Sequence, residues 1–340
     1  MTQTLHVLTG LVNPLPKNFP KALPRLVSVP HLLYGVELEI EGVGDAENWK
    51  VLGLHVERDG SLRNNGMEFI TAPMTYSNLA YCLEMFFKKN PITKDNYSER
   101  TSIHVHTNCL PLTWEQVQSL CLVYQVLEKL LFLWVGEDRD KNIFCVPWHQ
   151  TNLTYRTLSK SPDHTRFRNW QKYTALNLLP LYTQGTVEWR HMNGHCDVER
   201  ILLWCRLINC IYGYVLSTSL EDIKTQLMQL NVSSEYGQIL VTIFKDLSGT
   251  FLQIPRYENY LEEGVLDTKY GLLGEATQAE KPVDMQEMMN FVAAQRNPFA
   301  AVRAAPRDPG RFARPFQAVP DWVVIDDLVP AAPAAEQENV

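Results

Sequence analysis

The sequence predicts an α+β protein in which helices cover one face of a β-sheet and polar side chains occupy the other. Four short segments alternate apolar residues with acidic, imidazole or basic ones, a period of two that is typical of strands. Long apolar segments with helical spacing separate them, and these helices must cover the apolar face of the strands. The four predicted strands are residues 34–41, 66–71, 101–108 and 186–191.

Capping and breaking residues set the order of the other elements. A helix over 76–89 ends where Asn90 meets Pro91, because the residue before proline avoids helical geometry. Thr113 and Gln116 form a T-x-x-Q capping box that begins a long apolar helix running to about Val135. The other predicted elements are a turn-rich segment at 55–62, a polar loop at 137–149, a strand around 172–179, a helix capped by Asp197 and ending near Leu216, and helices near 220–230 and 235–247.

Proline content and charge divide the chain into four parts. Residues 1–32 are rich in proline and predict an extended arm, while 33–250 form the main domain. Residues 251–296 are predicted to be a helical extension, and the Pro/Ala-rich tail at 297–340, which ends in acids, is predicted to be disordered. Within the tail, the apolar run at 321–328 is a candidate docking segment for a partner, although an incidental run explains it equally well.

Composition excludes several classes of protein. The formal net charge of −7 argues against nucleic acid or an anionic membrane as the main partner. The 7 cysteines are scattered without a C-x-x-C pair, which favours reduced thiols over disulfides or a zinc site. No secretory signal is visible, and the apolar run at 201–216 is too short to span a bilayer, so we expect a soluble cytoplasmic protein.

Each polar strand has a structural explanation when it is taken alone. The three glutamates of the first strand fit a solvent-facing strand surface, which is the favoured interpretation for one such strand. His104 and His106 fit a zinc site, a buried hydrogen-bond network or an ordinary surface. Glu188 and Arg190 fit a surface ion pair of little energetic weight.

Taken together, the polar strands predict a site for divalent cations and phosphate. Carboxylates gathered on one sheet face repel one another unless a cation neutralises them. Oxygen-rich ligation with one or two imidazoles suits Mg²⁺ or Mn²⁺ better than Zn²⁺. Arg190 beside them indicates an anionic ligand, and phosphate is the obvious one. Because the sequence has no G-x-x-x-x-G-K-[ST] motif, this phosphate site would be built on a sheet without a P-loop.

The motifs follow one another in a specific order along residues 33–216. They are residues 35–39 (GVELE), 59–61 (DGS), 66–73 (GMEFITAP), 103–106 (IHVH), 139–145 (RDKNIFC), 172–177 (KYTALN) and 185–191 (GTVEWRH). This combination resembles the amidoligase family of the glutamine-synthetase and glutamate–cysteine-ligase superfamily. The chain departs from the family pattern at Ser102, where relatives often carry glycine, and at Gly194-His195, where they often carry Gly-Thr.

The resemblance implies an antiparallel sheet curved into a half-barrel, like the glutamine-synthetase catalytic domain, with long helices on its convex face. The domain at 33–250 would then be the catalytic domain, binding ATP and two or three Mg²⁺ (or Mn²⁺) ions on the concave face. The implied metal ligands are Glu37, Glu39, Glu68, Glu188 and one of His104 and His106, with a slight preference for His104. The implied catalytic residues are Arg190, which contacts the ATP phosphates, and Glu188, and the further candidates for nucleotide binding are Asn142, Lys172 and Asn177.

The activity that follows from the resemblance is ATP- and Mg²⁺-dependent ligation of a carboxylate and an amine. An acyl-phosphate intermediate would lead to an amide or isopeptide bond, and the substrates would be amino acids, peptides or protein side chains. The residues identify neither substrate nor the oligomeric state. Two other classes stay open: a metal-dependent hydrolase that turns over without nucleotide, and a non-catalytic binding or assembly protein that retains the ligase fold. Phosphoryl transfer to a guanidine shares the same chemistry.

Overall fold

The computed structural model describes Thr4 and residues 32–44, 49, 54–136, 138–151, 172–230 and 235–274. All of them lie in the larger of the two units into which the chain divides, residues 1–292. Nearly all of the predicted N-terminal arm, the predicted tail at 297–340 and its apolar run at 321–328 lie outside the described residues.

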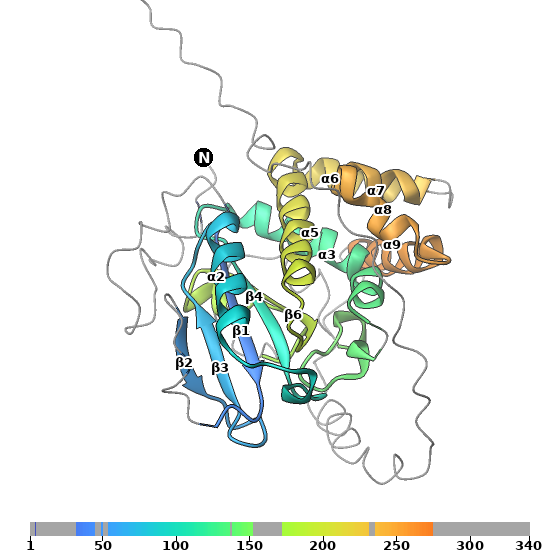
Figure 1. Ribbon diagram of the computed structural model, residues 1–340. Helices are drawn as coiled ribbons and strands as arrows, with labels where there is room; N and C mark the ends of the chain where they lie inside the picture. The colour runs from blue at the N-terminus through green and yellow to red at the C-terminus, as the bar shows by residue number, and fades with distance from the viewer. Residues whose placement is uncertain are drawn as a thin grey trace, which may run out of the picture. The chain divides into compact units, whose positions relative to one another are not determined.

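A six-stranded antiparallel sheet forms the centre of the described region, in the order β2-β3-β1-β4-β6-β5 (Figure 1). Its strands are β1 (Tyr34–Ile40), β2 (Leu54–Arg58), β3 (Met67–Thr71), β4 (Ser102–Asn108), β5 (Leu176–Asn177) and β6 (Thr186–Asn193). The strands β2 and β5 are its two edges, so the sheet is open. The predicted α+β class is therefore confirmed, and the four strands predicted from alternation are the neighbouring strands β3, β1, β4 and β6.

Two segments differ from the sequence prediction. The segment predicted only as turn-rich contains the edge strand β2, because residues 54–58 pair along their whole length with β3 before the turn begins. The strand predicted around 172–179 shortens to the two residues of β5. Leu179–Tyr182 forms a short 3₁₀ helix (η7) instead, with Pro180 in its first turn, and proline cannot donate a hydrogen bond to a strand partner.

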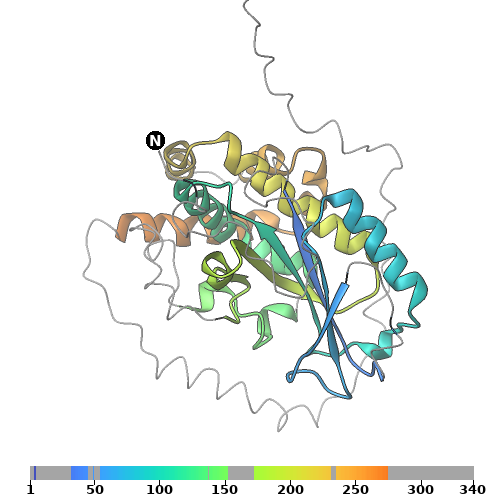
Figure 2. The same cartoon turned by 90° about the vertical axis from the view of Figure 1, so that its left-hand side faces the viewer.

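Long helices cover the apolar face of the sheet. The α-helices of the described region are α2 (Tyr76–Lys89), α3 (Trp114–Val135), α5 (Val198–Ser217), α6 (Leu220–Gln229), α7 (Tyr236–Phe244), α8 (Gly249–Leu252) and α9 (Tyr257–Gly274), and α2, α3 and α5 are the longest of those that lie against the sheet. In Figure 1, α2 and α5 lie side by side in front of β1, β3 and β4, and Figure 2 shows both helices along one side of the strands. Val36, Leu38 and Val105 of the central strands are buried in the core shared with these helices.

The predicted helix caps are confirmed. The Thr113 hydroxyl accepts the Gln116 backbone N–H while the Gln116 side chain accepts the Thr113 N–H, the two halves of a capping box. The Asp197 carboxylate accepts the Arg200 backbone N–H at the start of α5. These caps fix where α3 and α5 begin relative to β4 and β6, which carry the polar face of the sheet.

Helix α3 is the centre of the core. It is long and apolar enough to cross a membrane by length and composition alone, but 83% of its most apolar window is buried inside the protein. It packs against β6, α5 and α9, so burial in the core accounts for its composition. Five of the 7 cysteines are buried, and all 7 are free thiols, as the sequence indicated.

Candidate active site

The sheet register brings the polar residues of five strands onto one face. Glu37 of β1 lies opposite His104 of β4, and Glu39 of β1 lies opposite Glu68 of β3. His106 of β4 lies opposite Glu188 of β6, and Glu188 in turn lies opposite Asn177 of β5. Directly opposed residues of an antiparallel pair share a face and lie within side-chain reach of each other. The register alone therefore assembles the cluster that the sequence predicted.

A β-bulge in β6 lies at Arg190. Between the pairs Ile103–Met192 and Val105–Trp189, β6 carries one more residue than β4. As a result, Trp189 and Met192, which are three residues apart, are both buried in the core. Arg190 lies inside this bulge on the polar face, and its Nη1 is 3.5 Å from His104 Nδ1.

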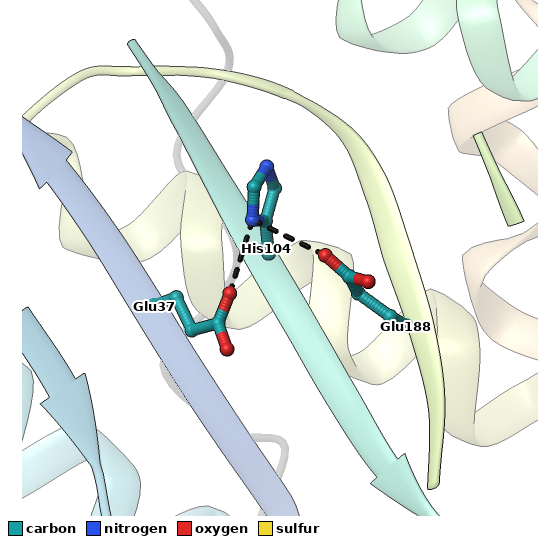
Figure 3. A group of neighbouring side chains, drawn as sticks. All are labelled: Glu37, His104 and Glu188. Atoms are coloured by element: carbon teal, nitrogen blue, oxygen red, sulfur yellow. Dashed lines mark hydrogen bonds and ion pairs between the residues drawn. The ribbon is translucent and has the colours of Figure 1, made fainter. Parts of the chain in front are cut away.

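His104 lies at the centre of the polar face (Figure 3). Its Nδ1 is 3.1 Å from Glu37 Oε2 and 3.3 Å from Glu188 Oε1. The imidazole is only 2% exposed, whereas Glu37 keeps 18% of its side-chain surface exposed. One ring nitrogen therefore faces two carboxylates from the strands on either side, and a ligand atom from each of the three residues lies within 4.8 Å of the others.

A second group of ligating side chains lies next to the first. It consists of Glu39, Glu68 and His104, whose ligand atoms also lie within 4.8 Å of one another. On this side of the ring, His104 Nε2 is 3.8 Å from Glu39 Oε1 and 2.8 Å from the Ser102 hydroxyl. Ser102 also donates a very short hydrogen bond to Glu39. Both groups found among the described residues include His104, and neither includes His106.

His106 contacts the cluster from its edge. Its Nε2 is 3.0 Å from Glu37 Oε1, and its Nδ1 is 3.0 Å from the Thr186 hydroxyl. Glu37 thus lies between the two histidines and has one carboxylate oxygen directed at each. Since the Thr186 hydroxyl and Glu37 hold the two ring nitrogens, His106 helps to orient Glu37.

Arg190 is held in place by contacts from three directions. Its Nη1 forms an ion pair with Glu188, and its Nε donates to the Phe144 carbonyl oxygen at 3.0 Å. The Tyr173 ring lies beside it, with the guanidinium carbon 5.8 Å from the ring centroid. A guanidinium fixed in this way presents a pre-positioned positive charge next to the carboxylates.

Arg139 supports the β6 bulge from behind. It is 1% exposed, and it donates from Nε to the His191 carbonyl at 3.0 Å and from Nη2 to the Arg190 carbonyl at 2.8 Å. A bulge disrupts the ladder of strand hydrogen bonds, and buried carbonyls left without a donor are costly. The Arg139 guanidinium supplies donors to both carbonyls and so stabilises the backbone conformation that directs Arg190.

The carboxylates of the site fall into two electrostatic environments. Burial alone would raise the pKa of Glu37, but His106 and His104 outweigh it and hold that pKa well below its ordinary value. Burial likewise opposes ionisation of Glu188, yet Arg190 and the two histidines lower its pKa. Both groups are therefore carboxylates at neutral pH.

Glu68 is different. Burial, together with the nearby charges of Glu37 and Glu39, raises its pKa to about 10. In the protein without a cation, the Glu68 carboxyl therefore stays protonated at neutral pH, because a third negative charge is too costly there.

The three other candidate residues differ in how close they lie to this cluster. Asn177 joins it, donating from Nδ2 to Glu188 Oε2 at 2.6 Å. Lys172 is exposed, and its Nζ lies 4.7 Å from the centroid of the Tyr173 ring that also contacts Arg190. The described contacts of Asn142 lie in the loop, where its side chain donates to the Glu99 carbonyl at 2.7 Å and accepts the Phe144 N–H at 2.9 Å.

Sequence reasoning missed several residues that shape the site. Ser102 and Thr186 lie on the polar face two residues from His104 and Glu188, so applying the alternation to every residue of the predicted strands would have found them. Tyr173 and Arg139 come from loops, where no periodic pattern exists. Their motifs were noted, but their contacts with β6 depend on tertiary folding.

The fold and the cluster define a class of protein: an α+β protein whose open antiparallel sheet carries a buried carboxylate–imidazole–guanidinium cluster on one face. Residues 55–212 match the family model described as "Putative amidoligase enzyme". This match covers the region that holds most of the motifs and supports the resemblance to the amidoligase family, which suggests an amide-bond-forming ligase. No curated protein matches the chain.

Proposed function

We propose that the protein is an ATP- and Mg²⁺-dependent carboxylate–amine ligase that forms an amide or isopeptide bond through an acyl phosphate. The observation that carries this proposal is the arrangement around His104. Two adjacent groups of ligating side chains share that imidazole, and Arg190 lies within 3.5 Å of it. A cluster that combines candidate cation ligands with a fixed guanidinium is suited to binding the phosphates of a nucleoside triphosphate.

The donor set fits a hard divalent cation. The candidate ligands of the two groups are four carboxylates and one shared imidazole. Such an oxygen-rich set is typical of Mg²⁺ or Mn²⁺ and not of Zn²⁺. The raised pKa of Glu68, caused by burial and by the Glu37 and Glu39 charges, is a second sign of fit, because a bound cation would remove that repulsion. Glu37, His104 and Glu188 would hold one cation, and Glu39 and Glu68 a second, with His106 orienting Glu37. When bound, the cations would neutralise the charge of the β- and γ-phosphates.

The protein's own side chains would position the nucleotide and the transferred group. Arg190, held by Glu188 and the Phe144 carbonyl, would place its free guanidinium edge against a phosphate. Asn177 keeps Glu188 oriented, and Lys172 would add positive charge beside the Tyr173 ring that Arg190 also contacts. Asn142 would act by ordering the loop that carries the Phe144 carbonyl.

The proposed reaction has two steps. First, a substrate carboxylate oxygen attacks the γ-phosphorus, which forms the acyl phosphate and releases ADP. An amine nitrogen then attacks the acyl carbon, inorganic phosphate leaves with the bonding electrons, and the nitrogen loses a proton. Arg190 would stabilise the negative charge that spreads over the transferred phosphoryl group, an effect worth about 10²–10³ in rate.

The finer fold assignment and the cellular setting belong to the same proposal. We propose that the open antiparallel sheet is the curved half-barrel of the glutamine-synthetase superfamily, with the polar face on its concave side. The proposed substrates are carboxylates and amines of amino acids, peptides or protein side chains, in the cytoplasm. The acidic end of the chain is proposed as a docking segment for a protein partner.

Release of ADP tests the proposed activity. Purified protein with ATP, Mg²⁺ and a panel of carboxylates and amines should release ADP only when both substrates are present. Arg190→Ala and Glu188→Gln should each reduce this release about 10²-fold or more, because they remove the fixed charge and its orienting carboxylate. Glu84→Gln, on the exposed face of α2, is the matched control and should have no effect. Turnover without nucleotide, or full ADP release by both site variants, would rule out the ligase.

A further inference from the structure

Ser102 lies between the two groups of ligating side chains and contacts both Glu39 and His104. It is 1% exposed on β4, and its side chain is on the polar face, two residues from His104. The hydroxyl has one hydrogen, and the structure directs it to Glu39 Oε2. The same oxygen lies 2.8 Å from His104 Nε2. Ser102 therefore connects a carboxylate to one particular ring nitrogen.

This geometry determines which ring nitrogen carries a hydrogen. Since the single Ser102 hydrogen is donated to Glu39, the Ser102 oxygen can take part in the second contact only as an acceptor. His104 Nε2 must then be the donor and bear a hydrogen. The partner of one ring nitrogen sets the tautomer of an imidazole and so the nitrogen that is available for a ligand.

We infer that Ser102 is a positioning residue that fixes a hydrogen on His104 Nε2 and so makes Nδ1 the nitrogen that receives a cation between Glu37 and Glu188. In Figure 3, one ring nitrogen of His104 faces both Glu37 and Glu188, and the other nitrogen points away from both. The group of Glu39 and Glu68 would then bind its cation through carboxylates, because the Nε2 on that side is occupied by Ser102. Only the binding of a cation at Nδ1 rests on the proposed function; the position of the ring hydrogen does not.

The position of the ring hydrogen can be measured without any cation. In protein labelled with ¹⁵N-histidine, the His104 signals are assigned by their absence in His104→Gln, and two-bond nitrogen–proton couplings show which nitrogen is protonated. We expect Nε2 to carry the hydrogen in the neutral wild-type ring, and Ser102→Ala to move it toward Nδ1, where Glu37 can accept it. A neutral wild-type ring with its hydrogen on Nδ1 would overturn the inference.

Cation affinity supplies the second measurement. Titration with Mn²⁺, followed by the loss of its free electron-spin resonance signal, should show Ser102→Ala binding about 10–100-fold more weakly, as expected when a residue that orients a metal-binding histidine is lost. Ser102→Thr keeps the hydroxyl and should restore most of the affinity. Thr107→Val is the matched control. It removes another buried β4 hydroxyl, on the opposite face where Thr107 contacts Tyr212 and Trp189, and should lower stability without changing Mn²⁺ affinity.

The outcomes separate this inference from the proposed function. Unchanged Mn²⁺ affinity in a folded Ser102→Ala protein, with wild-type binding intact, rejects the role of Ser102 and leaves the ligase standing. A wild-type protein that binds no divalent cation rejects the proposed function, and the ring-hydrogen measurement still decides whether Ser102 fixes the His104 tautomer. Equal weakening by Thr107→Val would show a general loss of structure and would also reject the inference.

Discussion

At the scale of single residues, the protonation of Glu68 makes the stability of the protein depend on pH. Its pKa is raised from 4.5 to about 10 by burial and by the charges of Glu37 and Glu39. The folded protein therefore holds a proton that the unfolded chain releases between these values. By linkage, the free energy of unfolding falls as pH rises through this window. His106, whose pKa is raised by Glu37 against the effect of burial, adds a smaller loss in the same direction above its ordinary value of 6.5.

We expect Glu68→Gln to remove most of this pH dependence in protein without a divalent cation. Relative to Glu68→Gln, the wild type should lose about 2 kcal/mol or more between pH 5 and pH 8. Urea denaturation at several pH values measures the difference. Mg²⁺ should stabilise the wild type more at pH 8 than at pH 5, because it competes with the Glu68 proton. Parallel pH profiles for the two proteins would contradict this expectation.

The two histidines should contribute unequally. His104 belongs to both groups of ligating side chains, whereas His106 holds Glu37 and Thr186 at the edge. His104→Gln should abolish the increase in melting temperature caused by Mg²⁺ or Mn²⁺, and His106→Gln should reduce it only in part. Melting curves with and without the cation provide the measurement. If His106→Gln abolished the increase in melting temperature and His104→Gln left it intact, His106 and not His104 would be the metal-binding histidine.

At the scale of elements, the bulge in β6 contains Arg190 and returns Met192 to the core. Without the bulge, regular alternation would place Trp189 and Met192 on opposite faces. The bulge needs hydrogen-bond donors for its carbonyls, and Arg139 provides them. The loop that contains Arg139 therefore stabilises the backbone of β6 at the bulge.

Arg139→Met should destabilise the protein by about 2–4 kcal/mol, because two buried carbonyls lose their donors. It should also weaken nucleotide binding, since Arg190 loses its fixed backbone. Urea denaturation and calorimetric titration with an ATP analogue measure the two effects. Arg63→Met is the control: Arg63 pairs with Glu99 at 2.7 Å, but both side chains are largely exposed, so its loss should cost less than about 1 kcal/mol. Similar losses for the two variants would argue against this role of Arg139.

At the scale of the whole described region, the C-terminal helices complete the core. The family match ends at residue 212, yet α9 packs along α3 and buries Leu261 and Val265. The approach is closest at Gly264, where an added Cβ would lie 2.3 Å from the Val126 carbonyl oxygen of α3. Helix α9 therefore forms part of the same hydrophobic core as the sheet.

Gly264→Leu should destabilise the protein by about 1–3 kcal/mol or more, because the side chain would push α9 away from α3. The matched control is Gly213→Ala in α5, where an added Cβ meets nothing within 4 Å. That change should stabilise the protein by about 0.5–1 kcal/mol, since glycine is a poor helix former. Thermal and urea denaturation of both variants test the expectation. A neutral Gly264→Leu would show that the contact between α9 and α3 is not close in solution.

The sequence alone determined the elements and the contents of the site. Alternation on 34–41, 66–71, 101–108 and 186–191 predicted strands with one polar face, because a strand repeats every two residues whatever its surroundings. The capping residues Thr113 and Asp197 predicted the starts of α3 and α5, because capping is local. The motifs that lie in these strands and loops were sufficient to indicate the amidoligase family.

Only the tertiary structure decided how these parts meet. Residues far apart in the chain meet in the strand order, in the β6 bulge and in the contacts of Arg139, Ser102 and Tyr173. No local sequence pattern predicts these contacts. The sequence predicted a helical extension at 251–296 without bounds for helix α9, because the apolar pattern there is weak, and the position of α9 depends on its packing against α3. The two nitrogens of His104 are equivalent in a sequence and become different only when Ser102 occupies one side of the ring and Glu37 with Glu188 the other.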